Sequence, residues 1–385
     1  SSIDLTKLGS STVENMLVEV IDSVVDYAEL MKSLFDFDLI TKMFKNGFKV
    51  RFDAMSAVGG PYAKYILEDM LGAPKGTVVN EVPLEDFGGL HPDPNPVNAA
   101  ELVTHMISDN ASDFGAASDG DADRNMIVGR EIAVSPSDSL AIIAANAQLI
   151  PGYASGLEGV ARSMPTSTAV DRVAKSLGIP CYETPTGWKF FGNLLDAGEI
   201  TLCGEESYGT GSGHIREKDG LWAVLFWINL VAATGKNIDE LVADHWLKFG
   251  RNFYSRHDYE AIDSKIANDI MNNLRVNLTK LEGSSHKGIK IVTADDFSYI
   301  DPIDGSVSNK QGIRIIFEND SRIVFRLSGT GTQGATLRVY LEKYESDTSL
   351  FGNSAQEELL SLIAFAEKIT KVKSLTGMVV PTVVT

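Results

Sequence analysis

Apolar and polar residues alternate with two different periods along the first third of the chain. Residues 16–36 begin with the two-residue period of a strand and continue with apolar positions three and four residues apart, as on one face of a helix. The same analysis predicts strands at 48–55, 76–83 and 114–119 and helices at 59–72 and 98–110. Strands and helices that take turns along a chain are typical of an α/β layered domain.

This alternation resumes after a loop. It predicts helices at 135–150, 166–178, 188–198 and 219–234, with strands at 156–163, 179–187 and 200–207 between them. Ser135 or Ser137 would cap the first of these helices. We therefore predict a second α/β domain, of a size usual for single domains.

The pattern changes again after a junction near residues 248–254. Alternating segments with turn signals between them predict strands at 288–302, 312–320, 321–329 and 335–344, flanked by helices at 264–278 and 354–370. Helices grouped around adjacent strands indicate an α+β domain with a largely antiparallel sheet. The predicted fold class is thus two consecutive α/β domains with mixed sheets, residues 1–133 and 134–248, followed by an α+β domain, residues 249–385.

Composition and charge narrow the range of partners. The 385 residues carry a formal net charge of −18, which argues against nucleic acid or an anionic membrane surface as the main partner. The longest apolar run, residues 221–233, is too short to span a bilayer, and the N-terminal residues have no signal-peptide layout. Cys181 and Cys203 fit no disulfide framework and indicate reduced thiols. These features predict a cytoplasmic protein in which any anionic ligand is met by local cations.

Three aspartates follow the predicted strand at 114–119. Asp119, Asp121 and Asp123 occupy every second position, and Arg124 comes directly after them. Open α/β sheets hold their ligands at the carboxyl ends of strands, and this spacing lets three side chains project the same way if the backbone is extended. An EF-hand loop counted from Asp119 would need Gly and Glu where the sequence has Arg124 and Arg130. Oxygen ligands favour Mg²⁺ over zinc or copper, so we predict a Mg²⁺ site, with a solvated acidic turn as the alternative.

Two further loops contain groups suited to a sugar. Residues 183–192 place a Thr-Gly turn before a helix, which a turn and helix cap explain by themselves. Residues 203–220 form a Gly-rich loop whose carboxylate and hydroxyl groups suit a polyhydroxylated ligand. Within it, Lys218 or His214 is a candidate for proton transfer, His214 more in a supporting role. A solvated charged loop is the alternative.

A fourth loop suits a phosphate. Residues 325–340 contain a formal GxGxxG pattern, but the segment after it alternates as a strand, so dinucleotide binding is rejected. Hydroxyl groups, backbone N–H groups and two flanking arginines, Arg326 and Arg338, are typical of a phosphate-binding loop. Together the loops predict a metal site, a hydroxyl-binding loop and a phosphate cradle that hold a sugar phosphate in a cleft between domains.

Several of these segments resemble one known family. They are DGDADRNMIVG, ARSMPTSTAVDRV, TPTGWKFFGNLLDAG, CGEESYGTGSGHIREKDGLWAV and RLSGTGTQGATLRVY, with VPLEDFGGLHPDPNP as further support. From about Met16 to the C-terminus the chain resembles the α-D-phosphohexomutase superfamily, in particular the eukaryotic-type phosphoglucomutases. The resemblance implies an enzyme that interconverts glucose 1-phosphate and glucose 6-phosphate, with Mg²⁺ as cofactor and glucose 1,6-bisphosphate as intermediate and activator. We expect it to bind small sugar phosphates as a monomer or weak dimer.

The resemblance also implies a role for each candidate residue. Asp119, Asp121 and Asp123 would bind Mg²⁺, and the catalytic candidates are Arg124, beside the transferring phosphoryl group, and Lys218, as a proton-transfer group. The implied sugar ligands are Thr186, Gly187, Glu205 and Ser207. The implied ligands of the non-reacting phosphate are Arg326, Ser328, Thr330 and Arg338.

One family feature is not found in the sequence. The family carries its phosphoryl group on a serine in a Thr-x-Ser-His-Asn-Pro type loop, and none of the 385 residues form that string. We therefore expect a phosphoglucomutase without its first domain, as a fragment of a longer chain or as a natural non-catalytic derivative, with the fragment favoured.

Phosphoryl transfer relies on positioning and charge stabilisation, and without that serine the transferred group has no carrier. The chain alone is therefore expected not to turn over. The alternative is a non-catalytic sugar-phosphate-binding or regulatory relative, and a preference for mannose or N-acetylglucosamine phosphates is a weaker idea.

Overall fold

The computed structural model describes residues 3–329 and 334–385, which form two compact units. Unit 1 comprises Ser1–Ala133, Asn146–Gly156 and Asp219–Ile238, and unit 2 comprises Val134–Ala145, Leu157–Lys218 and Asp239–Thr385. Each unit is therefore assembled from segments that lie far apart in the sequence. The domain boundaries expected at 133/134 and 248/249 stay a prediction.

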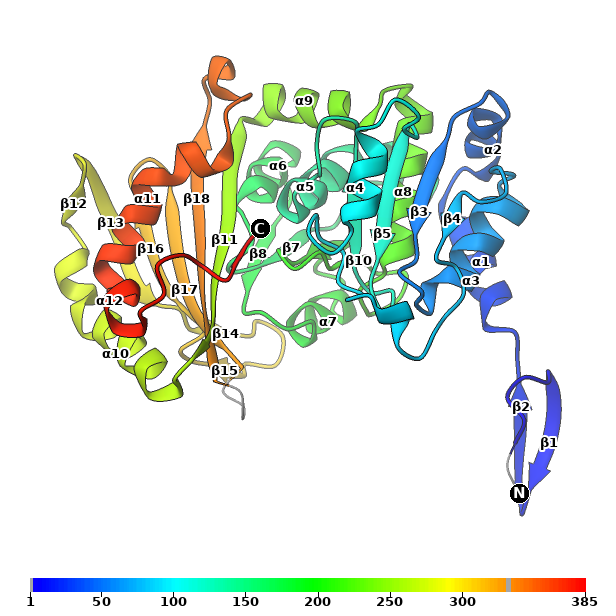
Figure 1. Ribbon diagram of the computed structural model, residues 1–385, viewed down its shortest axis with the longest axis horizontal. Coiled ribbons are helices and arrows are strands. Elements are labelled where there is room, and N and C mark those ends of the chain that lie inside the picture. Colours follow the sequence, from blue (N-terminus) through cyan, green and yellow to red (C-terminus); the bar gives the residue numbers. More distant parts are fainter. Residues whose placement is uncertain (1–2, 330–333) are drawn as a thin grey trace. The chain divides into compact units, whose positions relative to one another are not determined.

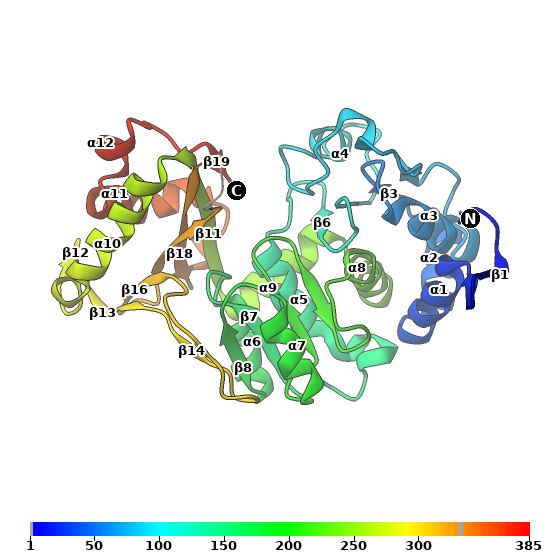
Figure 2. The same cartoon turned by 90° about the horizontal axis from the view of Figure 1, so that it is seen from below.

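The sheet of unit 1 has four strands in the order β4-β3-β5-β6 (Figures 1 and 2). Strand β3 (Val50–Asp53) runs parallel to both β4 (Val78–Val79) and β5 (Phe114–Ser118). Strand β6 (Asn125–Val128) turns back antiparallel to β5. The sheet is therefore mixed, and the hairpin between β5 and β6 carries the three aspartates.

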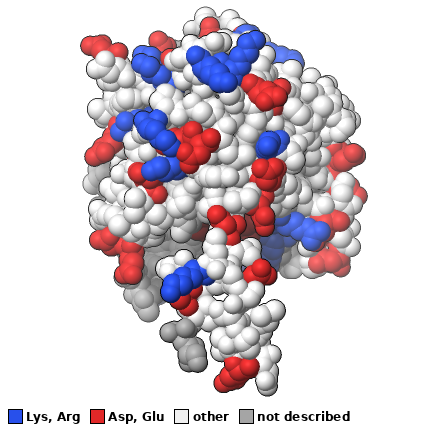
Figure 3. Space-filling model, turned by 90° about the vertical axis from the view of Figure 1, so that its right-hand side faces the viewer, with Lys and Arg blue, Asp and Glu red and all other residues white. Residues whose placement is uncertain are grey.

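Helices and a separate hairpin complete unit 1. The helices are α1 (Ser23–Leu34), α2 (Phe37–Lys45), α3 (Gly59–Lys64) with a π-helical turn at Tyr65–Met70, α4 (Ala100–Met106) and α8 (Gly220–Thr234), and 3₁₀ turns lie at Phe87–Gly89, Ala147–Leu149 and Pro151–Tyr153. Strands β1 (Gly9–Val13) and β2 (Met16–Val20) pair in a two-stranded hairpin. The face of the molecule in Figure 3 shows this hairpin below a surface on which acidic and basic side chains are interspersed.

Helix α8 forms the centre of unit 1. Every residue from Gly220 to Val231 is buried, and the helix packs against α2, β5 and β6. A helix that is apolar around its whole circumference belongs in a protein interior, which explains why residues 221–233 lack amphipathic periodicity. The packing also brings the start of α8, which follows β10 in sequence, to the β5–β6 hairpin.

Unit 2 contains a four-stranded and a seven-stranded sheet. The first has the order β10-β9-β7-β8, with β7 parallel to β8 and β9 and with β10 antiparallel to β9. Its strands are β7 (Val160–Ser163), β8 (Cys181–Thr184), β9 (Leu202–Gly204) and β10 (Thr210–Ser212), and its helices are α5 (Pro136–Asn146), α6 (Ala169–Leu177), α7 (Lys189–Asp196) and α9 (Ile238–Phe249). The Ser135 side chain caps α5 by accepting a hydrogen bond of 3.0 Å from the Asp138 N–H, which decides between the two expected caps.

The seven-stranded sheet is antiparallel throughout, in the order β12-β13-β16-β17-β18-β11-β19. Its strands are β11 (Arg251–Ile262), β12 (Ser285–His286), β13 (Ile289–Asp296), β16 (Ile313–Phe317), β17 (Arg322–Ser328), β18 (Ala335–Glu345) and β19 (Val383–Val384). Outside it lie the β14 (Tyr299–Ile300) and β15 (Val307–Ser308) pair, α10 (Ser264–Leu281), α11 (Ala355–Thr370), α12 (Val372–Thr376) and a 3₁₀ turn at Thr348–Leu350. Helices α10 and α11 cover one face of this sheet (Figure 2), over a core that includes Phe253, Phe317 and Phe325.

The two mixed sheets and the antiparallel sheet confirm the predicted fold class. Single elements differ from their predicted bounds. The strand expected at 76–83 has only two residues, Val78–Val79. The strand and helix expected within 16–36 appear as β2 and α1, and an extended Phe35 separates α1 from α2, a helix that was not predicted. The residues around 248–254, predicted as a junction, contain the start of the twelve-residue strand β11.

Among the described residues, the structure has no single helix long and apolar enough to cross a membrane. Only the bent pair of α8 and α9, taken together, satisfies the length and composition expected of a span.

Candidate active site

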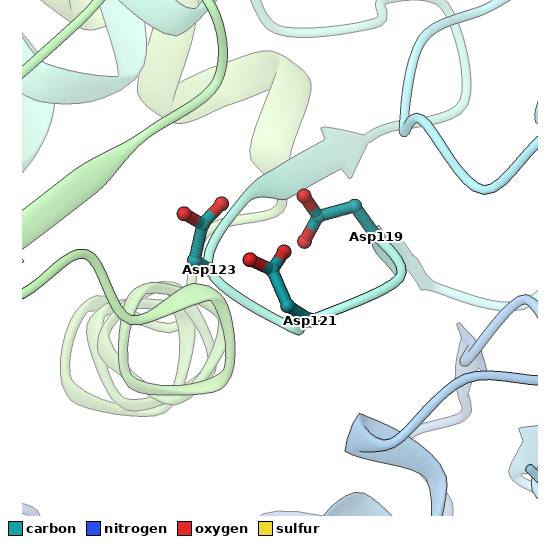
Figure 4. A group of neighbouring side chains, drawn as sticks. All are labelled: Asp119, Asp121 and Asp123. Atoms are coloured by element: carbon teal, nitrogen blue, oxygen red, sulfur yellow. The ribbon is translucent and has the colours of Figure 1, made fainter.

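The aspartate loop links β5 to β6 through a tight turn. Asp119 directly follows β5, and Ala122 adopts a left-handed conformation with φ of +62°. The two-residue spacing would align the side chains on an extended backbone, but here the backbone turns. The turn itself brings the carboxylates together. Figure 4 shows the three side chains grouped on this loop.

The three carboxylates lie close enough to share one ion. Asp119, Asp121 and Asp123 each offer one oxygen, and these atoms lie within 4.8 Å of one another. Asp119 is buried, Asp123 is half-buried and Asp121 is exposed, so the group opens to solvent on one side. The grouping that the sequence predicted is thus present in the fold.

Arg124 lies beside the aspartates. Its backbone N–H donates to Asp119 Oδ1 at 3.0 Å, and its Nε lies 3.5 Å from Asp119 Oδ2 and 3.6 Å from Asp123 Oδ1. Its Nη1 donates to Asp93 Oδ1 at 2.9 Å, so the guanidinium is shared with a fourth carboxylate. Sequence reasoning missed Asp93; the only signal was its position between two prolines in HPDPNP.

The charge balance of the loop fits a divalent cation. Burial and the charges of Asp123 and Asp121 raise the pKa of Asp119 to about 7, in spite of the Arg124 N–H bond that favours the ionised form. Negative charge in this hairpin therefore exceeds what the protein itself compensates. An all-oxygen donor set with excess negative charge suits a hard ion such as Mg²⁺, with water completing the coordination.

The two sugar-binding candidates from separate loops meet in unit 2. The Gly187 N–H donates to Glu205 Oε1 at 3.1 Å, and Gly187 has a φ of +119°, a conformation that favours glycine. Thr186 precedes Gly187 in the sequence and Ser207 follows Glu205 two positions later. Both are half-buried. The structure thus joins the Thr-Gly turn and the start of the Gly-rich loop.

Lys218 lies beside Gly209 of the Gly-rich loop and Trp188, which follows the Thr-Gly turn. A Cβ added to Gly209 would come within 2.4 Å of Lys218 Cδ, so the absence of a side chain at Gly209 makes room for the lysine stem. Lys218 Nζ lies 5.9 Å from the centre of the Trp188 ring, which follows the Thr-Gly turn. His214 accepts or donates a bond of 2.7 Å with Ser212 Oγ, consistent with a supporting role.

Glu206 is a buried residue between the sugar-binding candidates Glu205 and Ser207; the sequence placed it in the Gly-rich loop but gave it no specific role. Its carboxylate accepts a hydrogen bond of 3.0 Å from Ser163 Oγ, and its N–H donates to Thr166 Oγ1 at 2.9 Å. These bonds fix the loop backbone from the side of β7. No sequence pattern links residues 163–166 to Glu206, because the contact spans about forty positions.

The two arginines predicted to bind a phosphate, Arg326 and Arg338, are direct neighbours across strands. Arg326 on β17 pairs in register with Arg338 on β18, which pairs in turn with Asp258 on β11. Arg338 Nε lies 3.7 Å from Asp258 Oδ2, and Arg326 Nη1 donates to Tyr340 at 3.3 Å. Asp258 offsets part of this positive charge, but two like charges directly opposite each other are unfavourable, so the arginine pair would favour an added anion.

The remaining two phosphate candidates lie at the end of β17. Ser328 is its last residue and is half-buried, whereas Thr330 lies outside the described residues. Asp258 and Tyr340 had no sequence signal, because only strand register places them beside the arginines.

Family models match almost the whole chain. Residues 25–131 match phosphoglucomutase/phosphomannomutase α/β/α domain II, residues 136–249 match domain III of the same description, and residues 251–382 match the phosphoglucomutase-1 C-terminal domain.

Individual proteins are similar over the full chain. It is 60% identical to a phosphoglucomutase of Rhizobium radiobacter over 385 residues, and 53% identical to the chloroplastic phosphoglucomutase 1 of Marchantia polymorpha over 394 residues. All of this chain is covered in both alignments, which span 71% and 60% of the respective relatives. Other relatives are named as cytoplasmic enzymes.

A solved structure shows the same fold. It is the exocytosis-sensitive phosphoprotein pp63/parafusin, a phosphoglucomutase from Paramecium, in an open form, with a TM-score of 0.91 and 49% identity over all of this chain and 69% of that one. The chain belongs to the phosphoglucomutase family of the α-D-phosphohexomutase superfamily.

Proposed function

We propose that these residues serve the interconversion of glucose 1-phosphate and glucose 6-phosphate through glucose 1,6-bisphosphate. The observation that carries the proposal is the convergence of Asp119, Asp121 and Asp123 beside Arg124 in a chain of this family. Relatives that match the whole chain are named phosphoglucomutases, which supports the glucose enzymes over other hexose mutases.

The roles follow from the chemistry of each group. The aspartates would hold Mg²⁺, which neutralises a phosphoryl group during transfer. Arg124, oriented by Asp93, would face that phosphoryl group, and Lys218 would exchange a proton with the reacting hydroxyl.

The other candidates would bind the substrate away from the reacting atoms. Thr186, Gly187, Glu205 and Ser207 would contact the sugar, and the hydrogen bond from the Gly187 N–H to Glu205 holds two of these residues together. The non-reacting phosphate would lie against Arg326, Ser328, Thr330 and Arg338. The domain boundaries, a cytoplasmic location and a monomeric or weakly dimeric state belong to the same proposal.

The 385 residues contain no Thr-x-Ser-His-Asn-Pro string, so we propose that this polypeptide binds metal and sugar phosphate but does not turn over alone. A coupled assay with glucose 1-phosphate, glucose 1,6-bisphosphate and Mg²⁺ tests this, and clear activity would overturn it.

Calorimetry with the same sugar phosphates tests recognition separately. We expect glucose 1-phosphate to bind more tightly than mannose 1-phosphate or N-acetylglucosamine 1-phosphate, and Arg338→Met to weaken all three. The same absence of the serine string favours the second candidate function, a non-catalytic sugar-phosphate-binding relative. The non-catalytic relative predicts that sugar phosphate binds whether or not Mg²⁺ is present. The mutase predicts that the chain binds both sugar phosphate and Mg²⁺.

A further inference from the structure

The beginning of α8 touches the aspartate loop directly, within unit 1. The Gly220 N–H donates to the Ala122 carbonyl oxygen at 3.0 Å. A Cβ added to Gly220 would lie 2.1 Å from the Arg124 carbonyl oxygen and 2.9 Å from that of Ala122. Only glycine fits here, and the contact reaches the loop at the residue between Asp121 and Asp123.

That residue, Ala122, has a strained backbone conformation. Ala122 is left-handed, a conformation that costs energy for any residue with a Cβ. The hydrogen bond from Gly220 stabilises it there, and this turn brings the aspartate oxygens within sharing distance of one ion. The start of α8 therefore contributes to the shape of the metal loop without offering a ligand.

A tyrosine from a distant helix fixes the start of α8. Tyr27 on α1 donates from its hydroxyl to Asp219, with distances of 2.8 and 2.9 Å to the two carboxylate oxygens. Asp219 is buried and also caps α8, since its Oδ1 accepts a bond of 2.9 Å from the Trp222 N–H. A carboxylate bound from two directions leaves Gly220 little freedom to move.

We propose that Tyr27 and Asp219 are positioning residues for metal binding: they hold Gly220 against Ala122 and so keep the three carboxylates convergent. The inference rests on the proposed Mg²⁺ site. A purely structural role, in which Tyr27 only ties α1 to α8, predicts a loss of stability but no change of metal affinity in the folded protein.

A neighbouring tyrosine provides a matched control. Tyr62 lies edge to face with Tyr27 at 5.6 Å between ring centres, but its hydroxyl donates to Ser23 Oγ at 2.7 Å and not to Asp219. Tyr27→Phe and Tyr62→Phe therefore remove the same atom from the same contact region, and only the first removes a bond to the start of α8.

The test is a titration of the 385-residue protein with Mn²⁺, in which the electron paramagnetic resonance signal of the free ion measures how much is bound. Mn²⁺ takes the same oxygen ligands as Mg²⁺. Tyr27→Phe should raise the Mn²⁺ Kd about tenfold, as loss of outer-shell support does at other metal sites, and Tyr62→Phe should leave it within about twofold. Hydrogen–deuterium exchange gives a readout without metal: the Gly220 amide should exchange faster in Tyr27→Phe than in Tyr62→Phe.

Two outcomes would overturn the inference. If Tyr27→Phe binds Mn²⁺ and protects Gly220 as Tyr62→Phe does, the start of α8 does not position the loop. If the unsubstituted protein binds no Mn²⁺, the metal site and the inference fall together, whereas binding with no difference between the variants overturns the inference alone.

A substitution at the contact itself gives a larger effect. Gly220→Ala should raise the Mn²⁺ Kd about 100-fold, because the new Cβ displaces the Arg124 and Ala122 carbonyls. Gly192→Ala is its control, since a Cβ at Gly192 in α7 would meet no atom within 4 Å. An affinity of Gly220→Ala equal to that of Gly192→Ala would contradict the inference, and the tyrosine pair decides it if Gly220→Ala does not fold.

Discussion

Two buried carboxylates, one in each unit, have pKa values that are shifted in opposite directions. The pKa of Asp119 is raised to about 7 by burial and by Asp123 and Asp121. Burial alone would also raise the pKa of Glu342, but the charge of Arg322 and hydrogen bonds from Thr168 hold it below its usual value. The comparison separates a carboxylate whose charge Arg124 only partly offsets from one whose charge is fully compensated.

The surroundings of Glu342 explain its lower pKa. Its Oε1 accepts bonds from Ser167, Thr168 and Asn252, and its Oε2 accepts a bond of 2.8 Å from Arg322 Nε. Arg322 Nη2 donates in turn to the Thr166 carbonyl at 2.7 Å. Every acceptor site of Glu342 is used by the protein, so no ligand is needed.

The second compensated region of unit 2 follows the same rule. Buried Arg162 binds Asp171 through Nη2 at 2.8 Å and Glu183 through Nη1 at 3.0 Å. A buried charge network with satisfied partners fixes structure, whereas an acidic group in which the pKa of a buried carboxyl is raised favours a further cation. A dense cluster of charge is therefore a candidate ligand site only where its charges do not balance.

The largest expected effect is a loss of stability at the compensated carboxylate, Glu342. Glu342→Gln should lower the free energy of unfolding by about 3–5 kcal/mol, because it leaves the buried Arg322 guanidinium without its counter-charge. Urea denaturation measures this, with exposed Glu260→Gln as control, for which we expect a change within about 0.5 kcal/mol. Equal stability of the two variants would show that Glu342 is not a structural ion.

The matching change at Asp119, whose charge is only partly offset, should affect metal binding and not stability. Asp119→Asn removes a metal ligand and should raise the Mn²⁺ Kd about 100-fold, equivalent to about 2.7 kcal/mol. The free energy of unfolding without metal should not fall, because the substitution also removes repulsion within the triad. Exposed Asp109→Asn is the control in the same titration, and a loss of stability as large as that of Glu342→Gln would erase the distinction.

A third buried carboxylate, Asp138, lies between the two cases. Burial raises its pKa to about 6, although Arg251 and a 3.4 Å bond from Trp246 Nε1 oppose the shift. A carboxyl whose pKa is higher in the folded than in the unfolded state loses stability as pH rises between the two values, here from about 4 to about 6. His245, whose pKa burial lowers to about 4, contributes the opposite slope over pH 4 to 6.5.

Asp138→Asn isolates the carboxyl contribution from that of His245, which is common to both proteins. The difference in unfolding free energy between variant and unsubstituted protein should shift in favour of the variant by about 1.5 kcal/mol from pH 4.5 to pH 6. Denaturant unfolding at several pH values measures the slope. A difference that does not change with pH would mean that folding does not shift the pKa of Asp138, and a slope of the opposite sign would mean that Asp138 is compensated like Glu342.

The smallest effect is expected at an exposed ion pair. Arg216 Nε lies 2.5 Å from Asp196 Oδ1, but the two side chains are 69% and 50% exposed. Solvent screens such pairs, so Arg216→Ala should change the free energy of unfolding by less than about 1 kcal/mol, and added salt should reduce even that. A loss comparable to that of Glu342→Gln would show that burial does not set the value of these contacts.

Local sequence patterns predicted most of the fold. Strands with a clear two-residue period, such as β17, and amphipathic helices, such as α6, appear close to their expected positions. Strand β11 was not predicted, because polar residues such as Arg256 and Asp258 lie among its apolar ones. Their environment depends on β18, about eighty residues away in the sequence.

The candidate site was predicted to the same extent. The aspartates and Arg124 are neighbours in sequence, so their grouping could be inferred, although the mechanism could not: a left-handed turn at Ala122 replaces the expected extended backbone. Asp93, Glu206 and Tyr27 could not be found, because each acts through a partner distant in the chain.

The sequence by itself determined which chemical groups are present and the period of each element, because both are properties of neighbouring residues. It therefore determined the family, the fold class and the acidic triad. Only the tertiary structure decided which charges are compensated, because compensation depends on partners brought together by strand register and helix packing. That is why the pKa values of Asp119 and Glu342, both carboxylates of an acidic chain, shift in opposite directions.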